Sequence, residues 1–315
     1  MSALAPRSPL SQSPPEKVRD LPRDFILEQL AIYYQSQPPP QAVECDYSLC
    51  RCVETGLEFA WPMLPGNTIF YKWISSFASY YPVTRWEYRK TSQLIEHPHP
   101  ADQSLNVLDV GCGNGDFLLG LNIPPGNKFA LDLNQPAIEE CRRRGFNAFC
   151  GTIESARSAG AFDGRRFDAV TSFHCLEHVE NPVGFVRSLA DITRPGGRVF
   201  LSTPYSPMSF EAYWFDIMNH PPHHLTRWNL AAYKRLAATL GFRMRYFIPR
   251  SSGLKNAINA FRLTQYGFPR GSAPKAKLLR DLFFHFPRFA HCYQDQLKRP
   301  AEVRADVILI EFTID

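Results

Sequence analysis

The stretch VLDVGCGNGDF, residues 107–117, decides the fold. Its first four residues form an apolar run that predicts a short strand ending at Val110. Gly111, Gly113 and Gly115 follow, and glycine lets a backbone turn tightly and approach a ligand without a Cβ in the way. A strand that leads through such a loop into a helix is typical of α/β sheets, in which ligands bind beyond the carboxyl ends of the strands.

Strands and helices alternate along the chain that follows. Apolar runs predict seven strands, over residues 106–110, 128–133, 146–150, 167–173, 197–202, 242–248 and 306–313. Helical patterns lie at 116–121, 135–144, 182–193 and 229–240. Alternation of this kind predicts an α/β fold with a mostly parallel, seven-stranded sheet that is covered by helices on both faces.

The charges around the glycine loop narrow the choice of ligand. Asp109 precedes the first glycine by two residues, and Asp116 follows the last one. Carboxylates here would repel the pyrophosphate of a dinucleotide, whereas they suit a ligand that carries an ammonium and a sulfonium group. Asp132 lies at the end of the second strand, where a carboxylate can accept hydrogen bonds from both hydroxyls of a ribose.

Five motifs in order carry a family resemblance: VLDVGCGNG, ALDLN, CGTIE, FDAVTSFHCLEHV and RPGGRVFLSTP. Over roughly residues 104–250 the chain resembles class I S-adenosylmethionine-dependent methyltransferases, and among them the ubiquinone-type and bacterial surface-sugar and natural-product O-methyltransferases. The resemblance implies a Rossmann-like sheet, S-adenosylmethionine as cofactor, and O-methylation of a small molecule, a glycan or a lipid-linked acceptor. The alternatives are an RNA or protein methyltransferase, or a non-catalytic cofactor-binding module of the same fold.

The resemblance also implies a set of cofactor-binding residues. They are Asp109, Gly111, Gly113, Asn114, Gly115, Asp132, Leu133, Thr152, Ile153, Phe173 and His174. The first aspartate and the glycines would line the methionine end, and Thr152 and its neighbour would lie near the adenine amino group. Asp132 would hold the ribose, Leu133 would lie against the adenine, and Phe173 and His174 would close the site. The family usually has an acidic residue near position 152, so Thr152 departs from its pattern.

No metal is expected at the segment HCLEH, residues 174–178. Its spacing matches the inverted zinc-protease pattern H-x-x-E-H, which requires a helix, but the segment follows a predicted buried strand. It also resembles the E-x-x-E-H loop of ubiquinone-type O-methyltransferases, where side chains can hold a divalent ion, with His174 in place of the first Glu. We expect Glu177 and His178 to brace the loop through hydrogen bonds.

A second histidine group lies in PPHHLTRW, residues 221–228, after the fifth predicted strand. This stretch is similar to the substrate-side loop of the same methyltransferase subgroup. A hydroxyl acceptor must lose its proton, and an imidazole suits that task. His223 or His224 is the candidate base and His178 the next candidate, so turnover is expected to rise between about pH 6 and 7.5. The other interpretation is that these histidines only fix the shape of the loop.

Two further features precede the predicted sheet. Cys45, Cys50 and Cys52 suggest zinc, but three thiols without a clear fourth ligand indicate a degenerate site without metal. Residues 70–88 contain eight aromatic side chains, which favour either a lid packed on the main domain or a surface that stacks on the acceptor.

Length and composition bound the organisation of the 315 residues, whose net charge is +5. No apolar run reaches the roughly 18–20 residues that span a bilayer, and the start lacks the apolar stretch of a signal peptide. Eight cysteines are too few for a disulfide scaffold, so a reducing, cytoplasmic location is expected. We expect a disordered proline-rich segment over 1–40 apart from a short helix near Phe25–Tyr34, an aromatic-rich lid or substrate-side subdomain over 41–103, and the methyltransferase domain over 104–315.

Region 243–299 is basic, with twelve Lys and Arg against two Asp. Its place between the last two predicted strands suggests a helical insertion at about 251–303. A solvated surface, an anionic or lipid-linked acceptor, and peripheral contact with an anionic surface all fit this charge. No RNA-binding motif accompanies it, which argues against nucleic acid as a partner.

Overall fold

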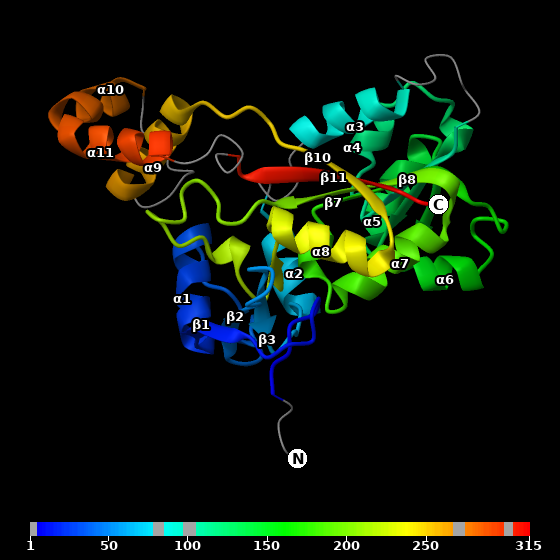
Figure 1. Cartoon of the computed structure of the whole chain (residues 1–315), viewed down its shortest axis with the longest axis horizontal. Helices are drawn as coiled ribbons and strands as arrows, with labels where there is room; N and C mark the ends of the chain where they lie inside the picture. The colour runs from blue at the N-terminus through cyan, green and yellow to red at the C-terminus, as the bar shows by residue number, and fades with distance from the viewer. Residues whose placement is uncertain (1–4, 78–84, 97–104, 267–274, 299–304) are drawn as a thin grey trace.

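The main body of the molecule is a seven-stranded sheet with helices on both faces (Figure 1). The computed structural model describes residues 5–77, 85–96, 105–266, 275–298 and 305–315. The strand order is β10-β11-β8-β7-β4-β5-β6. The strands are β4 (Val107–Val110), β5 (Lys128–Asp132), β6 (Asn147–Cys150), β7 (Phe167–Phe173), β8 (Thr193–Pro204), β10 (Arg243–Phe247) and β11 (Val307–Thr313). Six of them run in the same direction, and β11 pairs antiparallel with β8 and β10. The predicted fold class is confirmed.

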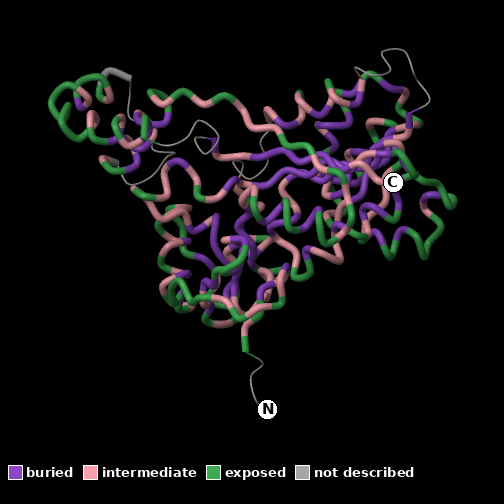
Figure 2. Tube along the Cα trace, in the orientation of Figure 1, coloured by how far each residue is buried: buried purple, intermediate pink, exposed green. Residues whose placement is uncertain are grey.

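Two groups of helices cover the two faces of this sheet. One group is α3 (Trp86–Glu96), α4 (Asp116–Leu119) and α5 (Gln135–Arg143), and the other is α6 (Ile153–Ser158), α7 (Pro182–Asp191) and α8 (Leu230–Leu240). Alternate strand residues face opposite sides: Leu108 packs in the core with α6–α8, and Val107 in the core with α3–α5. The central strands are therefore buried along their length, as Figure 2 shows.

A second, four-stranded sheet of order β1-β2-β3-β9 forms the N-terminal part. Its elements are β1 (Glu16–Leu21), α1 (Arg23–Tyr34), β2 (Tyr47–Arg51), β3 (Glu58–Trp61), α2 (Thr68–Ser75) and β9 (Thr226–Arg227). Leu21, Ile26 and Leu30 are fully buried in its core. The expectation of disorder over 1–40 is wrong, because the prolines flank these elements instead of interrupting them, with Pro22 directly before α1. Tyr80 and Tyr81 of the aromatic stretch lie outside the described residues.

The last strand of this small sheet comes from far along the chain. Strand β9 belongs to the segment that follows β8, and its Thr226 pairs with Phe59 of β3. Short 3-10 turns lie at η1 (Pro40–Ala42), η2 (Pro125–Asn127), η3 (Leu176–His178) and η4 (Ile217–Asn219). The pairing fixes the segment that carries His223 and His224 between the two sheets.

Three helices stand between β10 and β11: α9 (Gly253–Tyr266), α10 (Lys275–Phe284) and α11 (Phe286–Lys298). They lie apart from both sheets, at the upper left of Figure 1. Gln296 donates a hydrogen bond to the carbonyl of Ser209 at 2.9 Å, and the hydroxyl of Tyr213 donates to Asp295 at 2.8 Å. These bonds join the helices to the segment after β8. Within the described ranges, none of the helices is long and apolar enough to cross a membrane.

Candidate functional site

The glycine loop after β4 packs directly on the segment after β7. Gly111, Gly113 and Gly115 have φ values of +75°, +52° and +77°, which side chains rarely adopt. A Cβ built on Gly111 would lie 2.1 Å from Sγ of Cys175. The loop is thus a cradle of bare backbone, and the residues that start the HCLEH segment cover one side of it.

Asp109 lies at the end of β4, just before this loop. It is 2% exposed, and the Thr171 hydroxyl donates a hydrogen bond to its Oδ1 at 2.7 Å. Burial raises the pKa of Asp109 to about 8, the Thr171 hydrogen bond opposes that shift, and the nearby Asp132 charge adds to it. A buried carboxyl that ionises only with difficulty is well placed to pair with a cationic ligand.

Asp132 ends β5 on the other side of the loop. Its Oδ2 accepts a hydrogen bond from the backbone N–H of Gly113 at 2.8 Å, and its Oδ1 accepts from that of Asn134 at 2.8 Å. Each carboxylate oxygen keeps a second lone pair, so hydroxyl donors can still bind there. The next side chain, Leu133, is 75% exposed and offers an apolar surface to a flat ring.

The remaining expected cofactor residues have local structural duties. Thr152 caps α6 in a capping box with Ser155, and Ile153 is buried in the core. Phe173 is 6% exposed and packs edge-on against Tyr88 and Phe117, with ring centroids 4.9 and 4.8 Å away. The side chains of Ile153 and Phe173 therefore support the cradle from the core.

His174 links the segment after β7 to helix α3. Its φ of +54° is left-handed, its Nε2 is 2.8 Å from Glu87 Oε1, and its Nδ1 is 3.3 Å from Glu177 Oε1. Burial alone would lower the pKa of His174, but the interactions with Glu177 and then Glu87 raise it above its usual value. His174 therefore bridges two buried carboxylates, which favour its protonated form.

His178, His223 and His224 meet at one point and form what we call the three-histidine cluster. One ring nitrogen of each lies within 4.8 Å of those of the other two. Nδ1 of His178 donates to the carbonyl of His223 at 2.6 Å, which ties the segment after β7 to the segment after β8. The rings of His223 and His224 stack with centroids 4.6 Å apart. The structure thus brings together all three residues that were proposed as base from the sequence.

Burial keeps this cluster neutral. It lowers the pKa of His178, and lowers the pKa values of His223 and His224 well below 6.5, with neighbouring histidines adding to the effect. The rise in turnover expected between pH 6 and 7.5 does not fit these environments. Because the pKa values of these imidazoles are lowered, a rise in turnover that follows their deprotonation would occur below pH 6.

His220, in the same loop, has a structural role. Its Nδ1 donates to the carbonyl of Asp216 at 2.7 Å, and its Nε2 accepts from Arg227 at 3.1 Å. Arg227 also pairs with Glu58 of β3 at 3.0 Å and with Glu211. This network anchors the loop on the small sheet.

One residue near the site, Glu87, escaped the sequence reasoning, whereas Tyr71 belongs to the aromatic stretch that was considered for acceptor stacking. Glu87 was hidden in the aromatic stretch, where a single acidic residue carries no motif. Tyr71, on α2, lies with its ring centroid 6.5 Å from that of His178 and 6.4 Å from that of His223. Glu87 has no signal in the sequence, because only the folded chain brings it to the segment after β7.

The expected thiol group lies in the small sheet. Cys50 and Cys52 are buried, and Sγ of Cys52 is 3.4 Å from the Ser11 hydroxyl. Burial would raise the pKa of Cys52, but hydrogen bonds from Ser11, Ser8 and Thr55 lower it to about 7. Within the described residues, Cys45, Cys50 and Cys52 do not form a set of converging ligand atoms.

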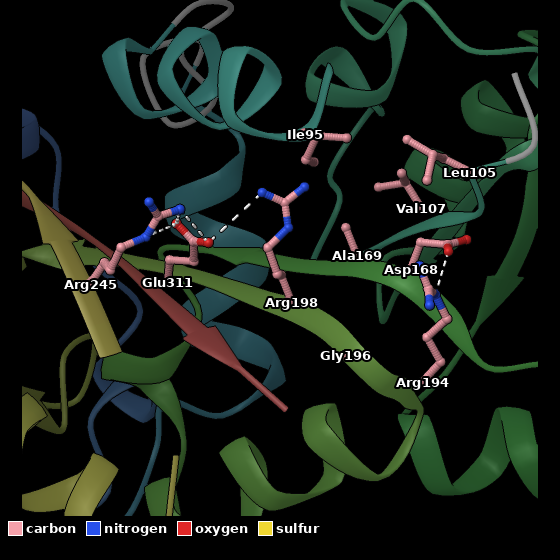
Figure 3. A pocket seen from close by; sticks show the side chains of 10 residues that line it. All are labelled: Ile95, Leu105, Val107, Asp168, Ala169, Arg194, Gly196, Arg198, Arg245 and Glu311. Atoms are coloured by element: carbon pink, nitrogen blue, oxygen red, sulfur yellow. Dashed lines mark hydrogen bonds and ion pairs between the residues drawn. The ribbon is translucent and has the colours of Figure 1, made fainter. Parts of the chain in front are cut away.

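A cavity of ≈ 270 Å³ opens at the amino ends of β4, β7 and β8, away from the glycine loop (Figure 3). Its charged side chains are paired: Arg194 with Asp168 at 2.5 Å, and Glu311 with Arg245 at 2.7 Å and Arg198 at 3.8 Å. Since ligands of such sheets bind at the opposite edge, this cavity is not the candidate site.

Comparisons with known proteins bear on this geometry. Residues 84–246, more than half of the chain, match the family model described as "Methyltransferase domain". The "Ubiquinone biosynthesis O-methyltransferase" of Azoarcus sp. (strain BH72) is 34% identical over 115 residues, which are 36% of this chain and 48% of that protein. The protein of the same name from Dechloromonas aromatica (strain RCB) is 36% identical over 101 residues, 31% of this chain and 43% of that protein. The chain thus spans half or less of the length of these curated relatives.

Solved structures give a more distant likeness. A SAM dependent methyltransferase from Archaeoglobus fulgidus is 17% identical with a TM-score of 0.44, covering 72% of this chain and 94% of that one. The plantazolicin methyltransferase in complex with a pentazolic desmethyl analog and SAH is 15% identical with a TM-score of 0.47, covering 79% of this chain and 92% of that one.

The donor set fits S-adenosylmethionine. The glycine loop presents bare backbone at three left-handed positions, Asp109 suits a cation, and Asp132 and Leu133 suit a ribose and an adenine. Together with the family match over residues 84–246, these features show that the chain belongs to the class I S-adenosylmethionine-dependent methyltransferases.

Proposed function

We propose that this enzyme transfers a methyl group to a hydroxyl oxygen of a small-molecule acceptor. One observation carries the proposal: the HCLEH segment touches Gly111 of the glycine loop through Cys175 and the second histidine loop through His178. The cofactor cradle and the three-histidine cluster are therefore neighbours. The names of the relatives, ubiquinone biosynthesis O-methyltransferases, support an oxygen acceptor over RNA or protein.

When bound, S-adenosylmethionine supplies an electrophilic methyl group on its sulfonium. Asp109 and the backbone of the glycine loop would hold its charged end, and Asp132 its ribose. Asp109 and Asp132 would not need to move, because the pairing of β4 with β5 and β7 fixes the strands that carry them. Alignment of the acceptor oxygen with the methyl carbon supplies much of the rate in such displacements.

The acceptor side is formed by the three-histidine cluster and Tyr71. A hydroxyl is a poor nucleophile until its proton has somewhere to go, and the cluster offers neutral imidazoles beside the cradle. His178 is the most accessible of the three, since His223 and His224 are 8% and 9% exposed. It is the member placed best to meet an acceptor.

A panel of paired acceptors tests this proposal. Each hydroxyl compound, such as a catechol, is assayed beside its amine analogue with methyl-labelled S-adenosylmethionine. We expect label on the hydroxyl compounds. Preferential labelling of the amines would overturn it. So would protein that binds S-adenosylhomocysteine but labels no component of a cell extract added as a second source of acceptors.

We further propose that helices α10 and α11 contact an anionic surface, which would suit a lipid-linked acceptor. Phe283, Phe284 and Phe286 are 78%, 69% and 61% exposed, and exposed basic side chains at Arg280 and Arg288 lie among them. Apolar rings beside cations are typical of interfacial binding. Flotation with anionic vesicles, compared with neutral ones and with a Phe283→Ser/Phe284→Ser variant, tests this contact. Equal flotation in all three cases would exclude it.

A further inference from the structure

The three-histidine cluster has the hydrogen bonding of a metal-ligand set. The Nδ1 atoms of His178, His223 and His224 face the carbonyl of His223, the carbonyl of Met218 and Oδ1 of Asn219, at 2.6, 2.8 and 3.0 Å. Carbonyl oxygens only accept hydrogen bonds, so each Nδ1 carries the proton and each Nε2 carries a lone pair. Metal-binding histidines are oriented in this way, with the second ring N–H donated to an oxygen.

Glu177 adds a negative charge next to these lone pairs. It is fully buried, and neither carboxylate oxygen accepts a hydrogen bond from the described residues. Its Oε1 is 4.0 Å from Nε2 of His224. His174 lies between Glu177 and Glu87, and Arg85 pairs with Glu87 at 3.6 Å. Oε1 of Glu177 is also 3.3 Å from Nδ1 of His174, and a nearby dication would further offset the cost of burying this carboxylate.

We propose that the three-histidine cluster binds one zinc ion through Nε2 of His178, His223 and His224. Imidazole ligands suit zinc, whereas magnesium and calcium prefer oxygen ligands. Three protein ligands leave the fourth position of a tetrahedral site open, as in catalytic zinc sites. The nitrogen ligands of a tetrahedral zinc site are about 3.3 Å apart. One ring nitrogen of each histidine lies within 4.8 Å of the others, so each ring would move inward slightly to bind the ion.

The role of this ion rests on the proposed function, although its binding does not. With zinc bound, the three imidazoles would act as ligands instead of bases; the ion would lower the pKa of an acceptor hydroxyl, whose proton would pass to solvent water. Glu177 would balance the charge of the ion and restrain His224.

Metal content of the purified full-length protein is the direct test. Protein dialysed against zinc and then against metal-free buffer should retain about one zinc per chain by elemental mass spectrometry. His178→Gln and His223→Gln, made separately, should each lose it. Two controls should keep it: His291→Gln, whose side chain is 71% exposed, and Cys45→Ser, which addresses the thiols. Cobalt in place of zinc should give the visible absorption of a tetrahedral site in the native protein only.

Binding of S-adenosylhomocysteine shows which variants are folded, because a ligand specific for the native state raises the melting temperature. The inference would be overturned if folded native protein retained no zinc. It would also be overturned if both histidine variants retained zinc and Cys45→Ser lost it. Stoichiometric zinc with no methyl transfer would instead count against the proposed function and leave the metal site standing.

Discussion

Cys175 occupies the space that a side chain at Gly111 would need, since a Cβ there would lie 2.1 Å from its Sγ. The segment after β7 and the glycine loop after β4 therefore fit together only because residue 111 is glycine. This contact holds the cofactor side and the acceptor side of the site in fixed relation.

Gly111→Ala should weaken binding of S-adenosylhomocysteine by at least about tenfold in calorimetry. The new methyl group must displace Cys175, and the φ of +75° disfavours any side chain. Gly160→Ala is the matched control, because its φ is +66° but nothing lies within 4 Å of the added Cβ. The double variant Gly111→Ala/Cys175→Ala should recover part of the affinity, since the Cβ of residue 175 lies 3.6 Å away. Equal affinities of Gly111→Ala and the control would refute the steric argument.

Asp132→Ala should also weaken cofactor binding, by roughly ten- to a hundredfold. Hydrogen bonds to a charged group contribute about 1.5–3 kcal/mol, and the loop N–H of Gly113 loses its partner as well. Asp116→Ala is a useful control, because that carboxylate pairs with Arg144 at 2.8 Å and should matter less. Unchanged affinity of Asp132→Ala in calorimetry would remove the residue from the site.

The sequence predicted the main sheet well because its signals are local. Each parallel strand is a short apolar run, and stops such as Gly241, with φ +74°, end helices where expected. Within residues 1–40 the helix near Phe25–Tyr34 was predicted, but β1 was missed because proline content was weighed above the apolar residues Leu21, Ile26 and Leu30, which share one core. Proline excludes regular structure only where it falls inside an element.

The convergence of the three histidines at one point could not be predicted for a different reason. His178 was compared with its neighbours in HCLEH, but its partners His223 and His224 come from a loop that β9 fixes against β3. Strand β9 is two residues long and has no pattern of its own. Its pairing with Phe59 depends on the arrangement of both sheets, so the three-histidine cluster appears only in the folded chain.

Cofactor affinity should rise with pH up to about 8. The pKa of Asp109 is raised to about 8, so this carboxyl is mostly protonated at neutral pH, whereas a cationic ligand pairs with its ionised form. Affinity for S-adenosylmethionine should increase by at most about tenfold per pH unit below 8. Asp109→Asn should make the affinity independent of pH in this range. Between about pH 4 and 8 the Asp109 carboxyl ionises only in the unfolded protein, which lowers the stability of the native fold as pH rises, so Asp109→Asn should also reduce this loss of stability. A pH-independent affinity in the native enzyme would contradict the assignment.

His178→Gln should lower turnover by about 10²–10⁴-fold while leaving cofactor affinity within a few-fold of native. Cofactor affinity should change little, because His178 hydrogen-bonds to the carbonyl of His223 and reaches the glycine loop only indirectly, through the HCLEH segment. His291→Gln, on the exposed face of α11, is the matched control and should keep native turnover. Saturation kinetics with labelled S-adenosylmethionine separates the two effects. If the His178 variant turns over at the native rate, the cluster only shapes the loop.

The pair between Glu87 and His174 should stabilise the fold most in mildly acidic solution. The pKa of His174 is raised, so its contribution is complete below about 6.5 and is lost as pH rises through its folded value. Burial opposes ionisation of Glu87, but His174 lowers its pKa overall, so its contribution is present above about 4.5 and is lost in acid. Glu87→Gln should therefore cost about 1.5–3 kcal/mol near pH 5.5–6.5 and progressively less toward pH 9.

Chemical denaturation of the two proteins across this pH range measures the difference. Glu180→Gln, at an exposed position before α7, provides the same substitution without burial and should follow the native curve. Because His174 precedes the segment that covers Gly111, Glu87→Gln should also weaken S-adenosylhomocysteine binding in parallel with stability. A constant offset between Glu87→Gln and native protein from pH 5 to 9 would mean that the contribution of Glu87 does not depend on the protonation of His174, and that its pairing with Arg85 accounts for it instead.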